Sequence, residues 1–391
     1  MNSKDIIQLF KGIGVIIDNG FKDKLCEKDI IWKIRSYFEK KDMPILSYSE
    51  LPSDNVIGHL NSVSFILLDW NLSDLPLGVP IPDANVKDNV EFLKSIKKQC
   101  FTPIFIFTNE DVDSIIDILV DNNLYDRGIN TNHIFVKSKS EIKNSRSLFS
   151  EIVKWVRRTP SIYILKEWEV AVKKASADLF VELYETNPSW PYVMYKNYYD
   201  DLGGDNSEIC DLINRNLIAR CTPITFDKDL ISKKRTGIGK TEIRKLLEKE
   251  KFLYSQSLQD FPAMGDIFKI KEDRYLINIR PDCDILRISN PELYCIKGCV
   301  VKEDKINKRN SRYEFKKGAF REQIDFSIVP FIDNGKIIEF KFKDLDKIVW
   351  EEIKDKRVGR LLPPYITRLK LQYMAYLQRQ AIPSIPNCAI K

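Results

Sequence analysis

The chain is poor in the residues from which many catalytic and metal centres are built. It has 391 residues but only two histidines, His59 and His133, which excludes a histidine-rich metal site or a long histidine relay. Its eight cysteines include no Cys-x-x-Cys pair. That spacing favours reduced thiols over a disulfide framework or a structural zinc site.

Long apolar runs are also missing. No stretch approaches the roughly 20 residues that a membrane-spanning helix needs. The first ten residues, MNSKDIIQLF, lack the basic and apolar regions of an export signal. We therefore expect a cytoplasmic protein with no membrane partner. The net charge of +6 is a small excess among 62 Lys or Arg and 56 Asp or Glu residues, so nucleic acid is an unlikely partner on composition.

What the first part of the chain does contain is a regular alternation of apolar, strand-like runs with amphipathic helical patterns. Five such strand and helix units predict a doubly wound α/β domain with a five-stranded parallel sheet. The predicted strands occupy residues 12–18, 44–52, 62–69, 102–109 and 132–138, and the predicted helices include 26–41, 86–99, 110–122 and 141–158.

Polar side chains stand where four of these strands end. Asp18 ends the first strand and Asn19 follows it, Asp69 ends the third, and Thr108 and Lys137 lie at the ends of the fourth and fifth to within one residue. Because the carboxyl ends of parallel strands meet at one edge of a sheet, we expect these side chains to lie close together. Carboxylate, amide and carbonyl oxygens suit Mg²⁺. An aspartate can act as a nucleophile toward phosphorus, while a lysine and a hydroxyl hold the phosphoryl oxygens.

In this pattern, the stretch from about residue 11 to residue 158 resembles a response-regulator receiver domain, so we assign a receiver domain to residues 1–158. The resemblance implies that Asp69 is the phosphoacceptor, Thr108 the switch hydroxyl and Lys137 the lysine that contacts the phosphoryl group. It also implies a bound Mg²⁺. The implied metal ligands are Asp18, Asn19, Asp69 and the backbone carbonyl of Asn71.

Three positions depart from the usual receiver pattern. Asn19 stands where receivers usually carry a second acid, and Ser138 follows the lysine where proline is usual. Ile134 stands where an aromatic switch residue is common. The first departure bears on metal binding, and the third bears on how the site is coupled to an output.

Beyond residue 158 the pattern changes. Residues 159–257 predict a helical middle domain, although the aromatic stretch 187–205 predicts turns. Residues 258–346 contain short strands and an Asn-Gly hairpin turn, which predict a small antiparallel β-barrel of SH3-like type. Residues 347–391 predict a C-terminal helical segment. The aromatic side chains of the middle domain, Trp168, Trp190 and Tyr192 among them, are expected to lie in the core between packed helices.

Two motifs in this half suggest chemistry and are interpreted as structural. Gly239, Lys240 and Thr241 resemble the end of a phosphate-binding loop, but Lys234 occupies the position of the first glycine, so a flexible basic linker ending in a helix is favoured. Asp282 and Asp284 flank a cysteine in the stretch RPDCDI, but no histidine is available to complete a zinc site.

The order of these parts, with PDCD at 281–284 and PPYITRL at 363–369, is similar to that of a family of bacterial response-receiver proteins. Those resemble the partners of divergent histidine kinase-like proteins in phage-defence systems such as Detocs. The resemblance implies a phosphorelay protein that accepts a phosphoryl group on Asp69 from a histidine kinase. It would act by contact with a downstream effector or as a phosphate buffer, without a separate enzyme activity.

Two alternatives stay open. One is a DNA-binding response regulator that uses its basic C-terminal helices, although no helix-turn-helix pattern is clear. The other is an effector with an active site around Asp282 and Asp284.

Overall fold

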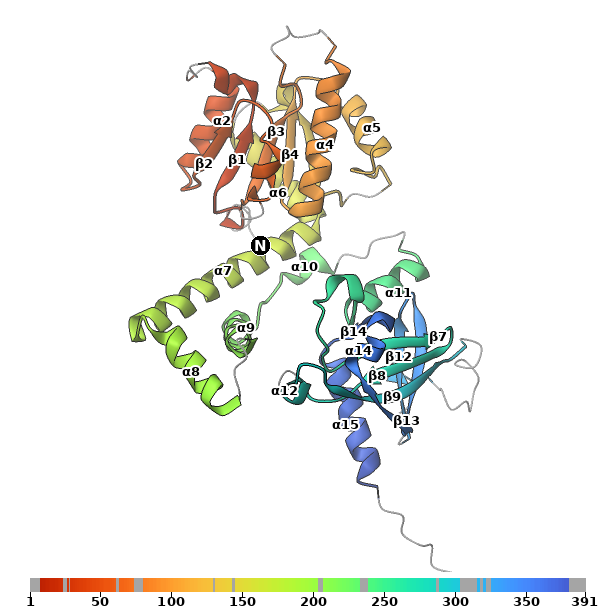
Figure 1. Cartoon of the computed structure of the whole chain (residues 1–391). Coiled ribbons are helices and arrows are strands. Elements are labelled where there is room, and N and C mark those ends of the chain that lie inside the picture. The colour runs from red at the N-terminus through yellow and green to blue at the C-terminus, as the bar shows by residue number, and fades with distance from the viewer. Residues whose placement is uncertain are drawn as a thin grey trace, which may run out of the picture. The chain divides into compact units, whose positions relative to one another are not determined.

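The computed structural model describes residues 8–23, 27, 29–60, 63–73, 80–128, 131–142, 145–202, 207–232, 238–285, 288–302, 315–316, 319–320 and 325–379. The chain forms two compact units, which are treated separately (Figure 1). The first unit comprises Met1–Trp190 and Asp211–Lys234, and the second comprises Pro191–Cys210 and Arg235–Lys391. The division therefore falls inside the segment 159–257 that was expected to form one helical domain. None of the helices within the described ranges is long and apolar enough to cross a membrane.

The first unit is built on a five-stranded parallel sheet, which confirms the α/β class and the number of strands. The strand order is β2-β1-β3-β4-β5. This order reverses direction between β1 and β3, and open α/β sheets bind ligands beyond the carboxyl ends of the strands at such a point. The strands are β1 (Gly14–Ile17), β2 (Ile45–Tyr48), β3 (Phe65–Asp69), β4 (Ile104–Thr108) and β5 (Ile134–Ser138).

Helices cover both faces of this sheet, and the sequence of β3 shows why. Phe65 and Leu67 join one apolar core with side chains of α2 (Ile30–Glu39) and α6 (Ser145–Arg158). Ile66 and Leu68 join the opposite core. All residues of β3 are buried, as expected for a strand between two helical layers. The helices of the second face are α3 (Asp54–Ile57), α4 (Asp83–Gln99) and α5 (Val112–Asp121).

Four helices follow: α7 (Pro160–Thr186), α8 (Trp190–Leu202), α9 (Ser207–Cys221) and α10 (Lys228–Ile231). The prediction of turns over 187–205 is wrong for α8. Pro191 lies in the first turn of that helix, where a missing N–H breaks no helical hydrogen bond. The expectation of buried aromatic side chains is also wrong for Trp168 and Tyr192, which are 51% and 63% exposed.

The second unit contains a curled antiparallel sheet of seven strands in the order β12-β13-β9-β8-β7-β14-β6 (Figure 1). An antiparallel β module is confirmed, but the strands described form an open sheet rather than a closed barrel. They are β6 (Phe252–Tyr254), β7 (Asp266–Lys271), β8 (Arg274–Asn278), β9 (Glu292–Val300), β12 (Phe326–Ile332), β13 (Lys336–Val349) and β14 (Arg357–Leu361).

This sheet reaches further than the predicted range 258–346. Strand β6 precedes that range, and β14 lies in the segment that was expected to be helical. The predicted C-terminal helix is present as α15. The remaining elements are α11 (Lys240–Lys249), α12 (Asp282–Ile285), α14 (Trp350–Ile353), α15 (Tyr365–Leu377) and the short pair β10 (Phe315–Lys316) and β11 (Ala319–Phe320).

The predicted Asn-Gly hairpin joins β12 to β13. Asp333, Asn334 and Gly335 have φ values of 45°, 68° and 76°, a left-handed path that favours Asn, Asp and Gly. The backbone N–H of Asn334 donates to Oε1 of Glu248 at 2.9 Å, which ties the turn to α11.

A buried ion cluster predicts one large stability effect in the second unit. Asp266 is fully buried and accepts from Nε of Arg360 at 2.6 Å, while Nη1 of Arg357 lies 3.6 Å away. Asp266→Ala leaves both guanidinium groups without this partner, so we expect the free energy of unfolding to fall by about 3–5 kcal/mol in urea titrations. The control is Asp346→Ala, because Asp346 pairs with Lys297 at 2.8 Å with both side chains exposed. We expect Asp346→Ala to lower the free energy of unfolding by about 1 kcal/mol or less. Equal losses in the two variants would contradict the large effect expected for the buried cluster.

Candidate functional site

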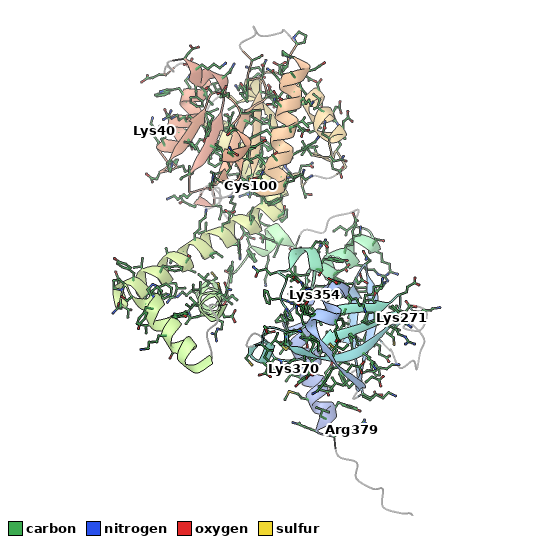
Figure 2. All side chains as sticks on the ribbon, viewed as in Figure 1. Lys40, Cys100, Lys271, Lys354, Lys370 and Arg379 are labelled. Carbon is green, nitrogen blue, oxygen red and sulfur yellow. The ribbon has the colours of Figure 1, made fainter. Side chains whose placement is uncertain are left out.

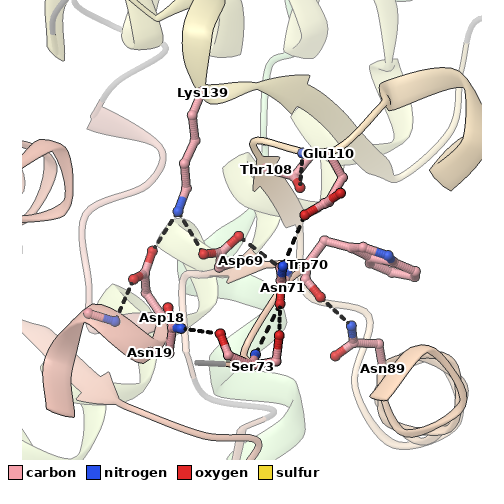
Figure 3. A network of polar contacts seen from close by, with 11 residues as sticks. Asp18, Asn19, Asp69, Trp70, Asn71, Ser73, Asn89, Thr108, Glu110 and Lys139 are labelled. Atoms are coloured by element: carbon pink, nitrogen blue, oxygen red, sulfur yellow. Dashed lines mark hydrogen bonds and ion pairs between the residues drawn. The ribbon is translucent and has the colours of Figure 1, made fainter. Parts of the chain in front are cut away.

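Two carboxylates meet where the sheet order reverses, beyond the carboxyl ends of β1 and β3 (Figure 3). Asp69 is the last residue of β3 and Asp18 follows β1 directly. Both are buried, with 5% and 3% of their surface exposed. The backbone N–H of Gly20 donates to Oδ1 of Asp18 at 2.9 Å, and the N–H of Asn71 to Oδ1 of Asp69 at 3.4 Å. The structure thus brings together the two acids that the sequence predicts.

One lysine joins the two carboxylates, and it is Lys139. Its Nζ lies 2.7 Å from Oδ2 of Asp69 and 3.0 Å from Oδ2 of Asp18. The sequence analysis assigned this place to Lys137, which instead forms an ion pair with Glu141. The geometry therefore corrects the choice of lysine.

The register of the sheet explains the correction. Lys137 lies inside β5, where it pairs with Phe107, and Phe107 in turn pairs with Asp69. Strand β4 therefore separates Lys137 from Asp69, and the side chain of Lys137 pairs with Glu141 just beyond its own strand. Lys139 is the first residue of the short 3₁₀ helix η3 (Lys139–Glu141), beyond the end of β5. The missed signal was the second lysine in the stretch VKSKSE. This lysine, Lys139, is the first one beyond the end of the strand.

The side chains of the other predicted residues, Thr108, Asn71 and Asn19, form hydrogen bonds outside the carboxylate pair. Thr108 ends β4, is fully buried, and accepts a hydrogen bond from the N–H of Glu110 at 3.0 Å. The side chain of Asn71 donates to Oε1 of Glu110 at 2.9 Å. Asn19 donates its side-chain N–H to the carbonyl of Ser73 at 2.8 Å, so its amide supports a loop rather than the two carboxylates. Glu110 and Ser73, which join this network, are not among the residues predicted from the sequence.

The electrostatics of the site follow from one ammonium shared by two carboxylates. Burial raises the pKa of Asp69 to about 6, and Lys139 offsets this only in part while Asp18 adds to it. Burial also disfavours the ammonium of Lys139, but the two carboxylates outweigh it and raise the pKa of that lysine. The lysine stays charged, and one negative charge of the pair remains unbalanced. Burial is therefore the main reason why Asp69 holds a proton more tightly than an exposed aspartate does, and the nearby Asp18 adds to the effect.

The raised pKa of Asp69 predicts a loss of stability as pH rises. The ordinary pKa of an aspartate is 3.8, so between about pH 4 and pH 6 the folded protein keeps a proton that the unfolded chain has released. The contribution of Asp69 to the free energy of unfolding is therefore full below about pH 4 and falls by about 3 kcal/mol by the time the pH passes 6. In urea titrations from pH 4 to pH 7, Asp69→Asn should remove this decrease. Parallel pH profiles for the two proteins would contradict the assignment.

The oxygen atoms at this site resemble the donor set that Mg²⁺ prefers. The carboxylates of Asp18 and Asp69 and the carbonyl of Asn71 are hard oxygen donors near the unbalanced negative charge, which suits a divalent cation. Asn19 does not face this pair. Within the described part of the chain, no three or more His, Cys, Asp or Glu side chains group as metal ligands. Two acids and a neighbouring carbonyl are donor types that suit a magnesium ion, which keeps several waters as ligands.

The acids of the RPDCDI stretch, Asp282 and Asp284, make contacts unlike those of the carboxylate pair. Oδ1 of Asp282 accepts from the backbone N–H of Met264 at 2.6 Å, and Sγ of Cys283 lies 3.9 Å from Oδ1 of Asp284. The first of these contacts fixes a loop. Basic residues also mark the second unit, where Figure 2 labels Lys370 and Arg379 at α15. The guanidinium of Arg379 lies 4.9 Å from the ring centre of Tyr376.

His133 lies outside the carboxylate pair. Its ring stacks on that of Phe101 with the centroids 5.3 Å apart. Burial, together with the charge of Lys97, lowers the pKa of His133 to about 4. A histidine kept neutral in this way packs as an uncharged ring beside Phe101.

The fold and the site together define a class: a doubly wound α/β unit with two acids and a lysine at its switch point. No protein-family model matches the chain, and no curated protein matches it either. The geometry of the site is therefore the basis on which a function is assigned.

Proposed function

We propose that the first unit is a receiver domain that accepts a phosphoryl group on Asp69. The observation that carries this proposal is the contact of one ammonium, on Lys139, with the carboxylates of both Asp18 and Asp69. A nucleophilic carboxylate, a second acid and a cation at the end of a parallel sheet are the groups that phosphoryl transfer to aspartate requires. The hydroxyl of Thr108, at the end of the neighbouring strand, supports the same reading.

The roles of the residues follow from their charges. An oxygen of Asp69 forms a bond to phosphorus while the bond from phosphorus to the donor breaks. If the donor is a phosphohistidine, the imidazole nitrogen keeps that electron pair and takes a proton from water. Lys139 can then move from its contact with the carboxylate to the new phosphoryl oxygens, and Thr108 can donate its hydroxyl to one of them. Asp18 stays in place as the carboxylate that offsets the positive charge of the site.

Asp18, Asp69 and the carbonyl of Asn71 would hold the Mg²⁺ of this proposal. When bound, the ion supplies positive charge that stabilises the negative charge developing on the phosphoryl oxygens. With only two acids, the site has one carboxylate fewer than the usual receiver pattern. A need for higher magnesium concentrations is the expected consequence.

The proposed partner that supplies the phosphoryl group is a histidine kinase, and the proposed output is contact with an effector protein or storage of the phosphoryl group. The proposed compartment is the cytoplasm, since the six cysteines in the described ranges carry free thiols. Incubation of the full chain with acetyl phosphate and Mg²⁺, followed by intact mass measurement, tests the core of the proposal. One added phosphoryl group supports it, and no addition at saturating donor and magnesium contradicts it.

A further inference from the structure

A cavity of about 240 Å³ lies along the outer edge of the sheet in the first unit. One of its walls is β5, and the four consecutive residues from Ile134 to Lys137 line it. Because neighbouring side chains of a strand point to opposite faces, four consecutive residues can share one cavity only where the edge of the strand forms the wall. The facing wall is α6, which contributes Glu151, Trp155 and Arg158 at helical spacing. The cavity is therefore a groove between a strand edge and a helix.

The backbone of β5 offers hydrogen-bonding groups to this groove. In the described part of the chain, β5 pairs with β4 alone and so ends the sheet. The N–H of Ile104 donates to the carbonyl of His133 at 3.5 Å, and in a parallel pair this register directs the backbone groups of Phe135 toward β4 as well. Those of Ile134 and Val136 then point the other way. An edge of this kind is a template with which another extended chain can pair.

The strand and the helix run in opposite directions along the groove. At one end, Nε1 of Trp155 donates to the carbonyl of Asn132 at 3.0 Å, and Arg158 lies about one turn further along α6. Near the other end, Lys137 lies close enough to Glu151 to act on its charge. The strand and the helix each advance by about 10 Å between the first and the last residue that line the groove. The groove thus has the length of about three to four extended residues.

The charges in the groove are balanced at one end and not at the other. Lys137 forms an ion pair with Glu141. Glu151 accepts from Nζ of Lys154 at 2.6 Å, a contact that lowers the pKa of Glu151, and the charges of Lys137 and Arg158 add to the effect. Arg158 is exposed, and no carboxylate in the described ranges forms an ion pair with it. An acidic group bound at this end would therefore meet a guanidinium that no ion pair occupies.

We propose that the groove between β5 and α6 binds an extended peptide segment of a partner protein, with an acidic residue beside Arg158. The segment adds to the edge of the five-stranded sheet, pairs with the backbone of Ile134 and Val136, and directs alternate side chains into the groove. A second copy of this chain is a poorer occupant. In an antiparallel pair of two β5 strands, Lys137 of each copy would lie near Arg158 of the other, which brings like charges together.

Selection from a library of random linear peptides on the full chain, without a phosphoryl donor, tests the proposal. We expect the selected peptides to share a proline-free stretch rich in β-branched residues, with Asp or Glu at one fixed position. A synthetic peptide of that sequence is then titrated by fluorescence anisotropy. Arg158→Gln should weaken its binding by about threefold to tenfold. The matched control is Arg157→Gln, because Arg157 is also exposed but does not line the groove, and this variant should bind as the wild type does.

Amide hydrogen exchange, measured by NMR, tests the strand pairing itself. Saturating peptide should slow the exchange of the amide hydrogens of Ile134 and Val136 by about tenfold or more, because they become hydrogen-bonded. The amide hydrogen of Phe135 is the internal control, since it already faces β4 and its exchange should change little. Protection of alternate residues distinguishes strand addition from a peptide that is held by Arg158 alone.

Four results would overturn the proposal. The first is that no such peptide is selected, and the second is an equal loss of affinity in Arg157→Gln and Arg158→Gln. The third is a bound peptide that leaves the exchange of Ile134 and Val136 unchanged. The fourth is protection of both amides by self-association of the chain without peptide, which would assign the edge to a second copy. The proposal is independent of the phosphoacceptor site, so Asp69→Asn should bind the peptide as the wild type does.

Discussion

Asp69→Asn is expected to reduce phosphoryl incorporation from acetyl phosphate to about one hundredth of the wild-type level or less. The carboxamide has nearly the same shape as the carboxylate but is a poor nucleophile. The substitution also removes one negative charge from the buried carboxylate pair, which shares the single ammonium of Lys139. We therefore expect the variant to be more stable than the wild type at pH 7, by about 3 kcal/mol.

The combination of lost labelling and gained stability is the informative result, because unfolding cannot explain it. Asp88→Asn is the matched control. Asp88 is an exposed aspartate of α4, and its variant should accept the phosphoryl group at the wild-type rate. Labelling of Asp69→Asn at the wild-type level would place the acceptor elsewhere.

The second large effect is expected at Lys139. Lys139→Ala removes the ammonium that contacts both buried carboxylates, so the free energy of unfolding at pH 7 should fall by about 3 kcal/mol or more. Phosphoryl incorporation should also fall, by about tenfold or more, because the cation that would stabilise the phosphoryl oxygens is gone. Urea titration and intact mass measurement report the two effects.

The matched control is Lys137→Ala, two residues away. Lys137 pairs with Glu141, which is 55% exposed, so the loss of that pair should cost about 1 kcal/mol or less and leave phosphoryl incorporation unchanged. The double variant Lys139→Ala, Asp69→Asn adds a further control, since removal of one negative charge should restore part of the lost stability. A larger effect at Lys137 than at Lys139 would contradict the structure and restore the original sequence-based choice.

Much of the first unit could be predicted because its strands are buried on both faces. Runs such as FILL before Asp69 and IFIF before Thr108 have no other plausible place than the centre of a parallel sheet. Each run ends in a polar residue, so the edge at which the acids meet follows from chain direction alone. The placement of Asp18 and Asp69 side by side was predictable for this reason.

The lysine could not be chosen correctly from the sequence, because two candidates lie two residues apart. Both Lys137 and Lys139 lie near the end of β5. The predicted strand 132–138 ends at the same residue as β5, Ser138, so the strand boundary does not explain the wrong choice. Which of the two ammonium groups reaches the carboxylates depends on tertiary packing, and the local pattern does not decide between them.

The second half was harder to predict for two further reasons. Proline and glycine around residues 187–205 suggested turns, but α8 uses Pro191 in its first turn and continues to Leu202. The strand β14 is short, contains two arginines and a glycine, and has little of the apolar character that identifies a strand. It is held by pairing with β6 and β7, which are distant in the sequence.

The central claim is that the carboxylate of Asp69 forms an acyl phosphate. Borohydride reduction of the phosphorylated full chain converts a phosphoaspartate into homoserine, and peptide mass spectrometry then identifies the residue that was modified. The account predicts homoserine at position 69 in the wild type, dependent on both the phosphoryl donor and Mg²⁺. Homoserine at another aspartate, or none in a chain that has gained a phosphoryl group, would contradict it.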